Sequence, residues 1–559
     1  MNKNIKVIAC YSEIMGNKMP KEDIIKLIKR VPLLSSFILL SQISSDGIDE
    51  TRIKGAFKEL YEKFAVGILN NKSLPSNLRE QVYKNVITKF NHEVENNVVF
   101  SQQSILNLWK WLLAYGDVNN INLLQEKTAS LSAITYLALA TNDYLDNENR
   151  QTTEELHSEV FSNAFFNHQE NTYNTLARTI LIYTEIAMNK ALYHENEFLD
   201  INHDFFNAFG YSIKEHIGLI FGLIACFYKP RELGSRWLQN PEVLLANLKF
   251  KDQAKDMLSS LTTNFKSISI WSKQKLDSKW DFMEFKKTPL IKLEDDQFMP
   301  FSLKLLYEHL FMGLYHKIRH IYPEDDSSFL TFYGKPFERY AQNLAQNSVN
   351  ESKLPYSVIT EFRYKKTKDS PDIMIRLNNK LLVIEVKSYR LTLSSITEAK
   401  ESSINRDMEK MVISPLKQTH DRIKELIEID HETVKGVEEY YLVVVNQGHF
   451  PTIPLFESRI TQELESYFDT PINGYYHLDI EEFEMLCSLM EKRRPIFKVL
   501  DNKNGEKNKL LPFKTFLYNN SYHVMKNKSL VDKFDQIVQE LGTIWFEHFS
   551  ENRNKNNRV

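Results

Sequence analysis

The sequence contains the stretch Pro371-Asp372-Ile-Met-Ile-Arg-Leu-Asn378-Asn379-Lys-Leu-Leu-Val-Ile-Glu385-Val386-Lys387. Its two runs of apolar and β-branched residues, 373–377 and 381–386, favour β-strands. The pair Asn378-Asn379 between them favours a tight turn, because asparagine tolerates the positive φ values that two-residue hairpins need. The stretch therefore predicts a β-hairpin centred on the two asparagines.

This hairpin would place Asp372 directly opposite Glu385, with their Cβ atoms about 4.5–5.5 Å apart. Lys387 follows Glu385 by two residues and points to the same face of the strand. Two carboxylates at this separation repel each other, and the apolar surroundings strengthen the repulsion. A divalent cation resolves the conflict, and oxygen ligands suit Mg²⁺ or Mn²⁺.

The combination of Pro371-Asp372, twelve further residues and Glu385-Val386-Lys387 resembles the motif of the PD-(D/E)xK nuclease superfamily, which has the restriction-endonuclease-like fold. The tripeptide Glu284-Phe285-Lys286 also matches Glu-x-Lys, but it lacks a strand pattern and a partnered Pro-Asp. The whole combination is therefore much more specific than the tripeptide alone. The resemblance extends from about residue 334 to about residue 476.

The resemblance implies that Asp372 and Glu385 are metal ligands, together with the backbone carbonyl of Val386 and water molecules. The ion would lower the pKa of a bound water molecule and stabilise charge on the phosphate. Lys387 would position the attacking water and help to neutralise the transition state. The alternative for Lys387 is a lysine at a strand end that only pairs with Glu385.

Two flanking residues match further positions of the superfamily. Glu338 lies on the preceding helix, where many members carry an acidic residue that reaches toward the metal; the alternative is an exposed glutamate in a first helical turn. Gln418 matches a glutamine that several branches place on the following helix, and Lys417 beside it could contact a phosphate. A polar surface pair is the alternative for both. Glu361 is an alternative acidic ligand or a strand-edge charge.

Nucleic-acid binding would have to depend on a local patch, because the formal net charge of −3 gives no global positive field. Lys365, Lys366 and Lys368 crowd the loop before Pro371 and could bind phosphates without sequence preference. The same lysines are equally compatible with an ordinary solvated loop. The sequence contains no Walker-type phosphate loop and no dinucleotide fingerprint, so we expect no nucleotide-driven motor within this chain.

The composition is that of an ordinary soluble protein, with 42% hydrophobic and 26% charged residues among 559. Cys10, Cys226 and Cys487 are far apart, which favours a reducing, cytoplasmic compartment without disulfides. The longest apolar stretch, 217–228, is shorter than the roughly 20 residues that a membrane span needs. We therefore expect a buried helix there and no membrane partner.

We expect a multidomain chain with an all-α N-terminal half and an α/β restriction-endonuclease-like core, in which helices flank a mixed sheet. The expected domains are a helical recognition or regulatory domain (1–275), a nuclease domain (285–500, core 334–476) and a C-terminal helical extension with a polar tail (501–559). The expected helices are 303–321, 336–346, 406–429 with a kink or a restart at Pro415, 480–490 and 530–549. The other expected elements are a linker at 273–287, a small hairpin near 290–301, strands at 356–364 and 440–446, and a polar loop at 391–403.

The expected function is a metal-dependent endonuclease or exonuclease that hydrolyses DNA phosphodiester bonds. Bacterial restriction or anti-phage defence is the expected setting, by family analogy. The helical half would provide target recognition, oligomerisation or regulation, with a second copy of the chain or a defence-system protein as partner. The alternatives are an RNase on the same fold, and a non-catalytic scaffold that binds nucleic acid or protein.

Overall fold

A computed structural model of the chain describes residues 8–45, 50–73, 75–121, 129–145, 153–166, 168, 172–228, 237–365, 368–522 and 527–545. The chain divides into two compact units. The first contains Met1–Gln151, Leu219–His309 and Trp545–His548. The second contains Thr152–Gly218, Leu310–Ile544 and Phe549–Val559.

The first unit is mainly helical, and aromatic rings fill its core. Phe37 stacks on Trp109 with ring centroids 4.5 Å apart, and Trp109 meets Phe301 edge-on at 4.9 Å. The helices that lie wholly in this unit include α1 (Tyr11–Met15), α2 (Lys21–Ile28), α3 (Leu33–Ile43), α4 (Glu50–Leu69), α5 (Ser76–Asn96), α6 (Gln102–Tyr115), α7 (Leu131–Asn142), α12 (Pro241–Leu244), α13 (Lys251–Ser260), α14 (Phe265–Gln274), α15 (Met283–Lys287) and α16 (Leu303–Glu308).

A small three-stranded sheet also belongs to the first unit. The predicted hairpin near 290–301 is confirmed as β2 (Leu290–Lys292) and β3 (Phe298–Pro300), which pair antiparallel. A third strand, β1 (Thr262–Asn264), pairs parallel to β2 within a segment that we expected to be helical. The predicted linker at 273–287 is wrong, because Phe282 and Phe285 are buried and hold this charged segment inside the unit.

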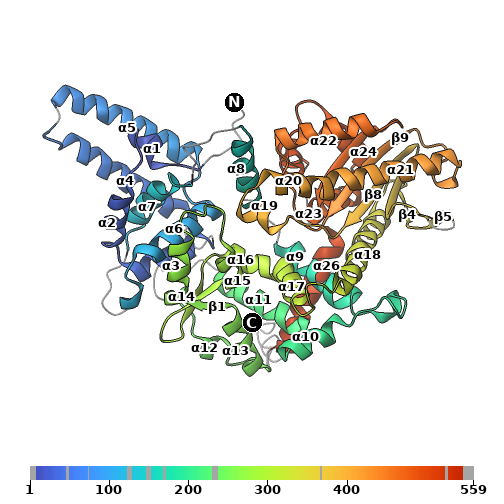
Figure 1. The fold of residues 1–559 in the computed structure, drawn as a ribbon, viewed down its shortest axis with the longest axis horizontal. Helices are drawn as coiled ribbons and strands as arrows, with labels where there is room; N and C mark the ends of the chain where they lie inside the picture. Colours follow the sequence, from blue (N-terminus) through green and yellow to red (C-terminus); the bar gives the residue numbers. More distant parts are fainter. Residues whose placement is uncertain are drawn as a thin grey trace, which may run out of the picture. The chain divides into compact units, whose positions relative to one another are not determined.

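The second unit is built around a mixed sheet, as the sequence predicts (Figure 1). The sheet has five strands, and one of them, β10, was not predicted. Its strand order is β10-β9-β8-β7-β4. Strands β8, β9 and β10 are parallel, whereas β7 is antiparallel to both β8 and β4. The strands are β4 (Ser357–Thr360), β7 (Ile373–Leu377), β8 (Lys380–Lys387), β9 (Glu439–Asn446) and β10 (Gly474–Asp479).

The predicted hairpin is confirmed in its register. Leu377 pairs with Lys380, Ile375 pairs with Leu382, and Ile373 pairs with Ile384. Asn378 has φ 56°, in the left-handed region that asparagine tolerates better than most residues. The turn is therefore centred on the asparagine pair, and the alternation of side chains along both strands is fixed.

Helices cover both faces of this sheet (Figure 1). Met374, Val383 and Leu442 point to one face, where they pack with buried residues of α20 (Glu401–Met408), α21 (Ser414–Glu428) and α22 (Pro454–Tyr467). Helices α18 (Ser328–Glu351) and α23 (Ile480–Glu491) contact the strands from the other face. Strands buried on both faces explain the near-continuous apolar runs of β8 and β9.

The helix predicted at 406–429 is continuous through Pro415 and contains a π-helical turn just before the proline, where a kink or a restart was predicted. Helix α20 continues into a π-helical turn, η6 (Glu409–Ile413), and α21 begins at Ser414. Pro415 directly follows this π-helical turn and has no N–H to donate to the carbonyl of Met411, and the side chain of Asn446 donates to that carbonyl at 2.8 Å.

Several other elements differ from the prediction. Helix α18 begins at Ser328 and not near residue 336, so Pro336 lies in its interior. Phe329, Phe332 and Phe337 are buried on both sides of the proline and stabilise the longer helix. The strand predicted at 356–364 is divided into β4 and β5 (Arg363–Lys365), and β5 pairs with β6 (Lys368–Asp369). The predicted polar loop contains α19 (Leu393–Thr397), and β10 was not predicted. The predicted helix at 530–549 is α26 (Lys528–Trp545); residues 546–549 and the polar tail lie outside the described residues.

The two units do not follow the expected linear domain order. Helices α8 (Thr153–Phe166) and α9 (Thr172–Ile180) come from the helical half but belong to the second unit. Phe161 packs edge-on against Phe450 and Phe456 in the core under the sheet. Apolar periodicity identifies such helices, but it does not say which core they join.

Helix α9 is also anchored by a buried ion pair. Arg178 lies 3.1 Å from the carboxylate of Glu484 on α23, and both side chains are almost completely buried. Tyr340 of α18 donates a hydrogen bond to the same carboxylate at 2.7 Å.

Among the described residues, no single helix is both apolar enough and long enough to cross a membrane. Within the described part of the chain, one pair of helices separated by a sharp bend, α10 (Ile201–Phe209) and α11 (Ile213–Tyr228), meets the criterion when the two are taken together.

The buried pair predicts a large loss of stability on truncation. We expect Arg178→Ala to lower the free energy of unfolding of the second unit by about 3–5 kcal/mol, because Glu484 is left as a buried carboxylate without its cation. Lys528→Ala, which breaks an exposed pair with Glu351, should cost about 1 kcal/mol or less. Urea unfolding followed by circular dichroism measures the free energy of unfolding of both variants. Equal losses in Arg178→Ala and Lys528→Ala would contradict the expectation.

Candidate active site

The hairpin register brings the predicted carboxylates together. Asp372 immediately precedes β7, and the pairing of Ile373 with Ile384 places it opposite Glu385 of β8. Asp372 is 6% exposed and Glu385 is 1% exposed. The sequence therefore predicted the position of both side chains, and the structure adds that both are buried.

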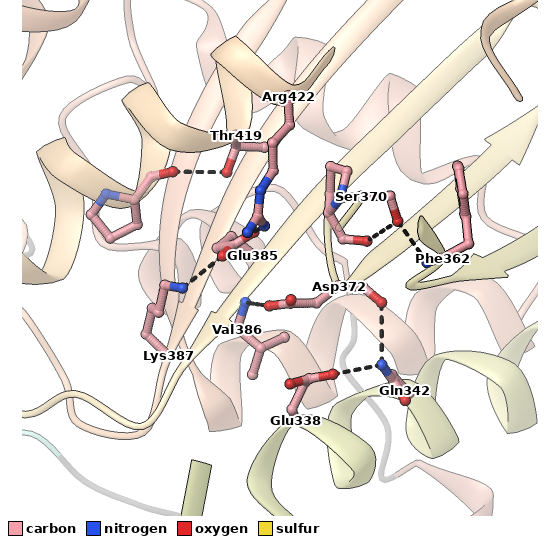
Figure 2. Close-up of polar contacts among 12 residues, drawn as sticks. Glu338, Gln342, Phe362, Ser370, Asp372, Glu385, Val386, Lys387, Thr419 and Arg422 are labelled. Atoms are coloured by element: carbon pink, nitrogen blue, oxygen red, sulfur yellow. Dashed lines mark hydrogen bonds and ion pairs between the residues drawn. The ribbon is translucent and has the colours of Figure 1, made fainter. Parts of the chain in front are cut away.

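Both carboxylate oxygens of Glu385 contact a cation (Figure 2). Lys387 Nζ lies 2.6 Å from Oε1, and Arg422 Nη1 lies 2.6 Å from Oε2. Arg422 belongs to α21, on the face of the sheet to which Glu385 points. No motif in the sequence marks Arg422, although it lies one helical turn after Gln418 on the same helix.

Asp372 is held through its side chain and its backbone. The backbone N–H of Val386 donates to Asp372 Oδ2 at 2.6 Å, and the side chain of Gln342 donates to the backbone carbonyl of Asp372 at 3.3 Å. Burial raises the pKa of Asp372 well above its ordinary value, and the negative charges of Glu385 and Glu338 raise it further. The carboxylates thus interact strongly, as two like charges in a poorly solvated place must.

Glu338 approaches the same site from α18, on the other side of the strands (Figure 2). It accepts a hydrogen bond from Gln342 at 2.9 Å. Burial, followed by the charges of Glu361 and Glu385, raises the pKa of Glu338 to about 7. The alternative of an exposed glutamate in a first helical turn is wrong, because α18 begins at Ser328 and Glu338 is half-buried.

A short polar network holds the segment just before Asp372. The backbone N–H of Phe362 donates to Ser370 Oγ at 2.9 Å, and Ser370 Oγ donates to the carbonyl of Pro371 at 3.1 Å. The backbone N–H of Ser370 in turn donates to the carbonyl of Phe362 at 2.8 Å. Ser370 is buried, and this network fixes the entry into β7.

The other predicted site residues do not join this cluster. Gln418 has an exposed side chain, and Lys417 pairs with Glu463 at 3.3 Å. Lys365 and Lys368 both pair with Glu425, so part of the positive charge before Pro371 is neutralised. Lys366 lies outside the described residues.

The residues at the centre fit a hard divalent cation. Asp372, Glu385 and Glu338 offer carboxylate oxygens, and the Val386 carbonyl would add a fourth oxygen donor; oxygen is the donor that Mg²⁺ and Mn²⁺ prefer. Lys387 and Arg422 balance part of the negative charge, but the raised pKa values of Asp372 and Glu338 indicate that the balance is incomplete. A bound cation would complete it.

Comparison with known families identifies the part of the chain that carries this site. Residues 334–446 match the family NERD, described as a nuclease-related domain. This segment extends from α18 to the end of β9 and is a PD-(D/E)xK-like nuclease domain, so the resemblance seen in the sequence is confirmed. No curated protein and no solved structure matches the chain.

The crowding of carboxylates predicts an unusual response to mutation. In the presence of a chelator at neutral pH, we expect Asp372→Asn to raise the melting temperature by about 2–4 °C, because one buried negative charge is removed. Mn²⁺ should then stabilise the wild-type protein much more than the variant.

Asp430→Asn is the matched control, since this aspartate is 80% exposed and pairs only weakly with Lys435. Asp430→Asn should change neither the melting temperature in chelator nor the stabilisation by Mn²⁺. The expectation would be contradicted if Asp372→Asn had a lower melting temperature than the wild-type protein in chelator. It would also be contradicted if Mn²⁺ raised the melting temperatures of the two proteins equally.

Proposed function

We propose that this protein is a metal-dependent nuclease that hydrolyses phosphodiester bonds of DNA. One observation carries the proposal: a buried Asp372–Glu385 pair, with Lys387 hydrogen-bonded to it, lies at the end of a hairpin inside the nuclease-related domain. A structural role alone does not account for two buried carboxylates placed face to face.

In the proposed mechanism, Asp372, Glu385 and the carbonyl of Val386 would hold Mg²⁺ or Mn²⁺, with Glu338 as an additional carboxylate. When bound, the ion lowers the pKa of a water molecule and neutralises charge on the phosphate. The backbone N–H of Val386 orients one oxygen of Asp372, and Gln342 orients Glu338. These fixed hydrogen bonds reduce the rearrangement that is needed when substrate arrives.

Lys387 acts as a cation in this mechanism. Burial lowers the pKa of Lys387, but the charge and hydrogen bond of Glu385 outweigh burial and raise the pKa above its ordinary value. A protonated lysine cannot take a proton from water. Lys387 therefore donates hydrogen bonds to the attacking water and to the phosphate as negative charge develops.

Arg422 has a second role in the proposal. Its guanidinium contacts Glu385 from α21 and can present further N–H groups to a phosphate oxygen. Arg422 thus replaces Gln418 as the residue of α21 that we expect to act in the reaction.

One observation favours a second candidate, the non-catalytic scaffold. Both oxygens of Glu385 are already paired with Lys387 and Arg422, so a metal ion would have to share or displace one of these contacts. In the scaffold, the two cations would stabilise the hairpin permanently, and the domain would bind nucleic acid without cleaving it.

The setting that we propose, bacterial restriction or anti-phage defence with a second copy of the chain or a defence-system protein as partner, depends on analogy alone. An RNase would use the same residues, and only the substrate distinguishes it.

The direct test incubates the full chain with plasmid DNA, linear DNA, single-stranded DNA and RNA, in Mg²⁺, Mn²⁺ or chelator. We expect metal-dependent cleavage of DNA, and a loss of at least about 100-fold in rate for Asp372→Asn, Glu385→Gln and Lys387→Met. Lys380→Met is the matched control: this lysine lies at the opposite end of β8 and pairs with Glu439.

Cleavage that survives unchanged in Asp372→Asn and Lys387→Met would overturn the assignment of the site. DNA binding without turnover in any metal would favour the scaffold instead. Cleavage of RNA alone would identify the RNase.

A further inference from the structure

A second group of metal-ligating side chains lies in the second unit, apart from the carboxylates of the hairpin. It consists of His168, His449 and Asp479. His449 Nδ1 lies 2.8 Å from Asp479 Oδ2, and His168 Nε2 lies 3.4 Å from the same oxygen. One nitrogen from each histidine and one oxygen of Asp479 all lie within 4.8 Å of one another.

The three residues come from segments that are far apart in the sequence. Asp479 ends β10 and caps α23, because its other oxygen, Oδ1, accepts a hydrogen bond from the backbone N–H of Glu482 at 2.8 Å. His449 follows the end of β9, and His168 follows α8. The cap fixes the carboxylate, so one of its oxygens remains directed at the two histidines.

The cluster lies at the same edge of the sheet as the nuclease site. Lys387 is in register with Asn446, and Asn446 is in register with Asp479, at the carboxyl ends of the three parallel strands. Adjacent strands are about 4.8 Å apart, so the backbones of Lys387 and Asp479 are separated by roughly 10 Å. The two sites therefore have separate ligands on different strands.

The geometry of the two imidazoles requires an explanation. Their rings stack with centroids 4.0 Å apart and planes 15° apart, and both direct a nitrogen at the same carboxylate. The side chains of His168, His449 and Asp479 are only 17%, 13% and 4% exposed. Two charged imidazoles would repel each other at this distance. Two neutral imidazoles can share one cation, but their lone pairs lie in the ring planes, so at least one of these nearly parallel rings must rotate about its side-chain bonds when the ion binds.

The donor set differs in kind from that of the hairpin. Two imidazole nitrogens and one carboxylate oxygen suit Zn²⁺ and related transition metals, whereas all-oxygen sites suit Mg²⁺. Bonds of about 2.0–2.2 Å in a tetrahedral site place neighbouring ligand atoms roughly 3.4 Å apart. The separation of 3.4 Å between His168 and Asp479 matches this value, whereas the 2.8 Å between His449 and Asp479 is a hydrogen-bond distance that would lengthen when an ion binds.

We propose that His168, His449 and Asp479 bind one transition-metal ion of the zinc class. The ion would fasten His168, which follows α8, to the carboxyl edge of the sheet and would leave one coordination position for water. It would thus link the helical half of the sequence to the nuclease core, through ligands separate from those of the proposed cleavage site.

The test measures metal binding by the full chain. Zn²⁺ is titrated against a chromophoric chelator, and bound zinc is counted by elemental analysis after dialysis. We expect one equivalent of Zn²⁺ in the wild-type protein, and dissociation constants raised at least about 100-fold in His168→Ala and His449→Ala, since the loss of even an indirect partner of a ligand costs about 10–100-fold. Asp372→Asn should leave this binding unchanged.

His477→Ala is the matched control. This histidine lies on β10 two residues before Asp479, but it contacts Glu457 at 2.8 Å and is not part of the cluster. It should retain the wild-type affinity for Zn²⁺.

A second measurement does not depend on the loss of binding. In Co²⁺-loaded protein, His168→Cys should add a thiolate-to-cobalt charge-transfer band while binding remains stoichiometric, because cysteine replaces one ligand by another. No stoichiometric Zn²⁺ in the wild-type protein, an affinity unaffected by both alanine variants, or no thiolate band would overturn the proposal. The three residues would then form only a hydrogen-bonded histidine pair on Asp479.

Discussion

The repulsion between Asp372 and Glu385 is the constraint around which the second unit is organised. The hairpin register forces the two carboxylates to face each other, and burial removes the water that would screen them. Neighbouring groups offset part of this cost: Lys387 and Arg422 pair with Glu385, and the backbone of Val386 binds Asp372. These contacts are strong, yet the pKa of Asp372 stays raised. The site is thus held in an arrangement that favours binding of a further cation.

The sheet provides the rigidity that this arrangement needs. β8 lies between β7 and β9, and its segment with Glu385 and Lys387 remains paired with β9 beyond the end of β7. On the β7 side, the backbone N–H of Val386 donates to the side chain of Asp372 instead. Helix α18 brings Glu338 and Gln342 from one face, and α21 brings Arg422 from the other. Functional groups on strands and long helices are held more accurately than groups on loops. The same sheet edge also carries the second, nitrogen-rich cluster at Asp479.

The sequence predicted the parts of the site that depend on local geometry. The register of the hairpin is determined by the asparagine turn and by the alternation of side chains along the two short strands. The positions of Asp372, Glu385 and Lys387 could therefore be predicted from this register. Glu338 was identified through the family resemblance. Arg422 was not found in this way, because the face of α21 that lies over Glu385 is set by the packing of the helix on the sheet, which no local pattern records. The grouping of α8 and α9 with the sheet, and of His168 with Asp479, depends on tertiary packing that no local pattern records.

The most direct test of the account is to locate the metal at the hairpin. Crystals of the full chain soaked in Mn²⁺ should show an anomalous difference peak between the side chains of Asp372 and Glu385, within about 2.0–2.6 Å of their oxygens. Crystals of Asp372→Asn, soaked in the same way, should lack this peak. A wild-type map with no peak at the hairpin, while both oxygens of Glu385 stay paired with Lys387 and Arg422, would contradict the account and leave a nuclease-like domain that binds no metal there.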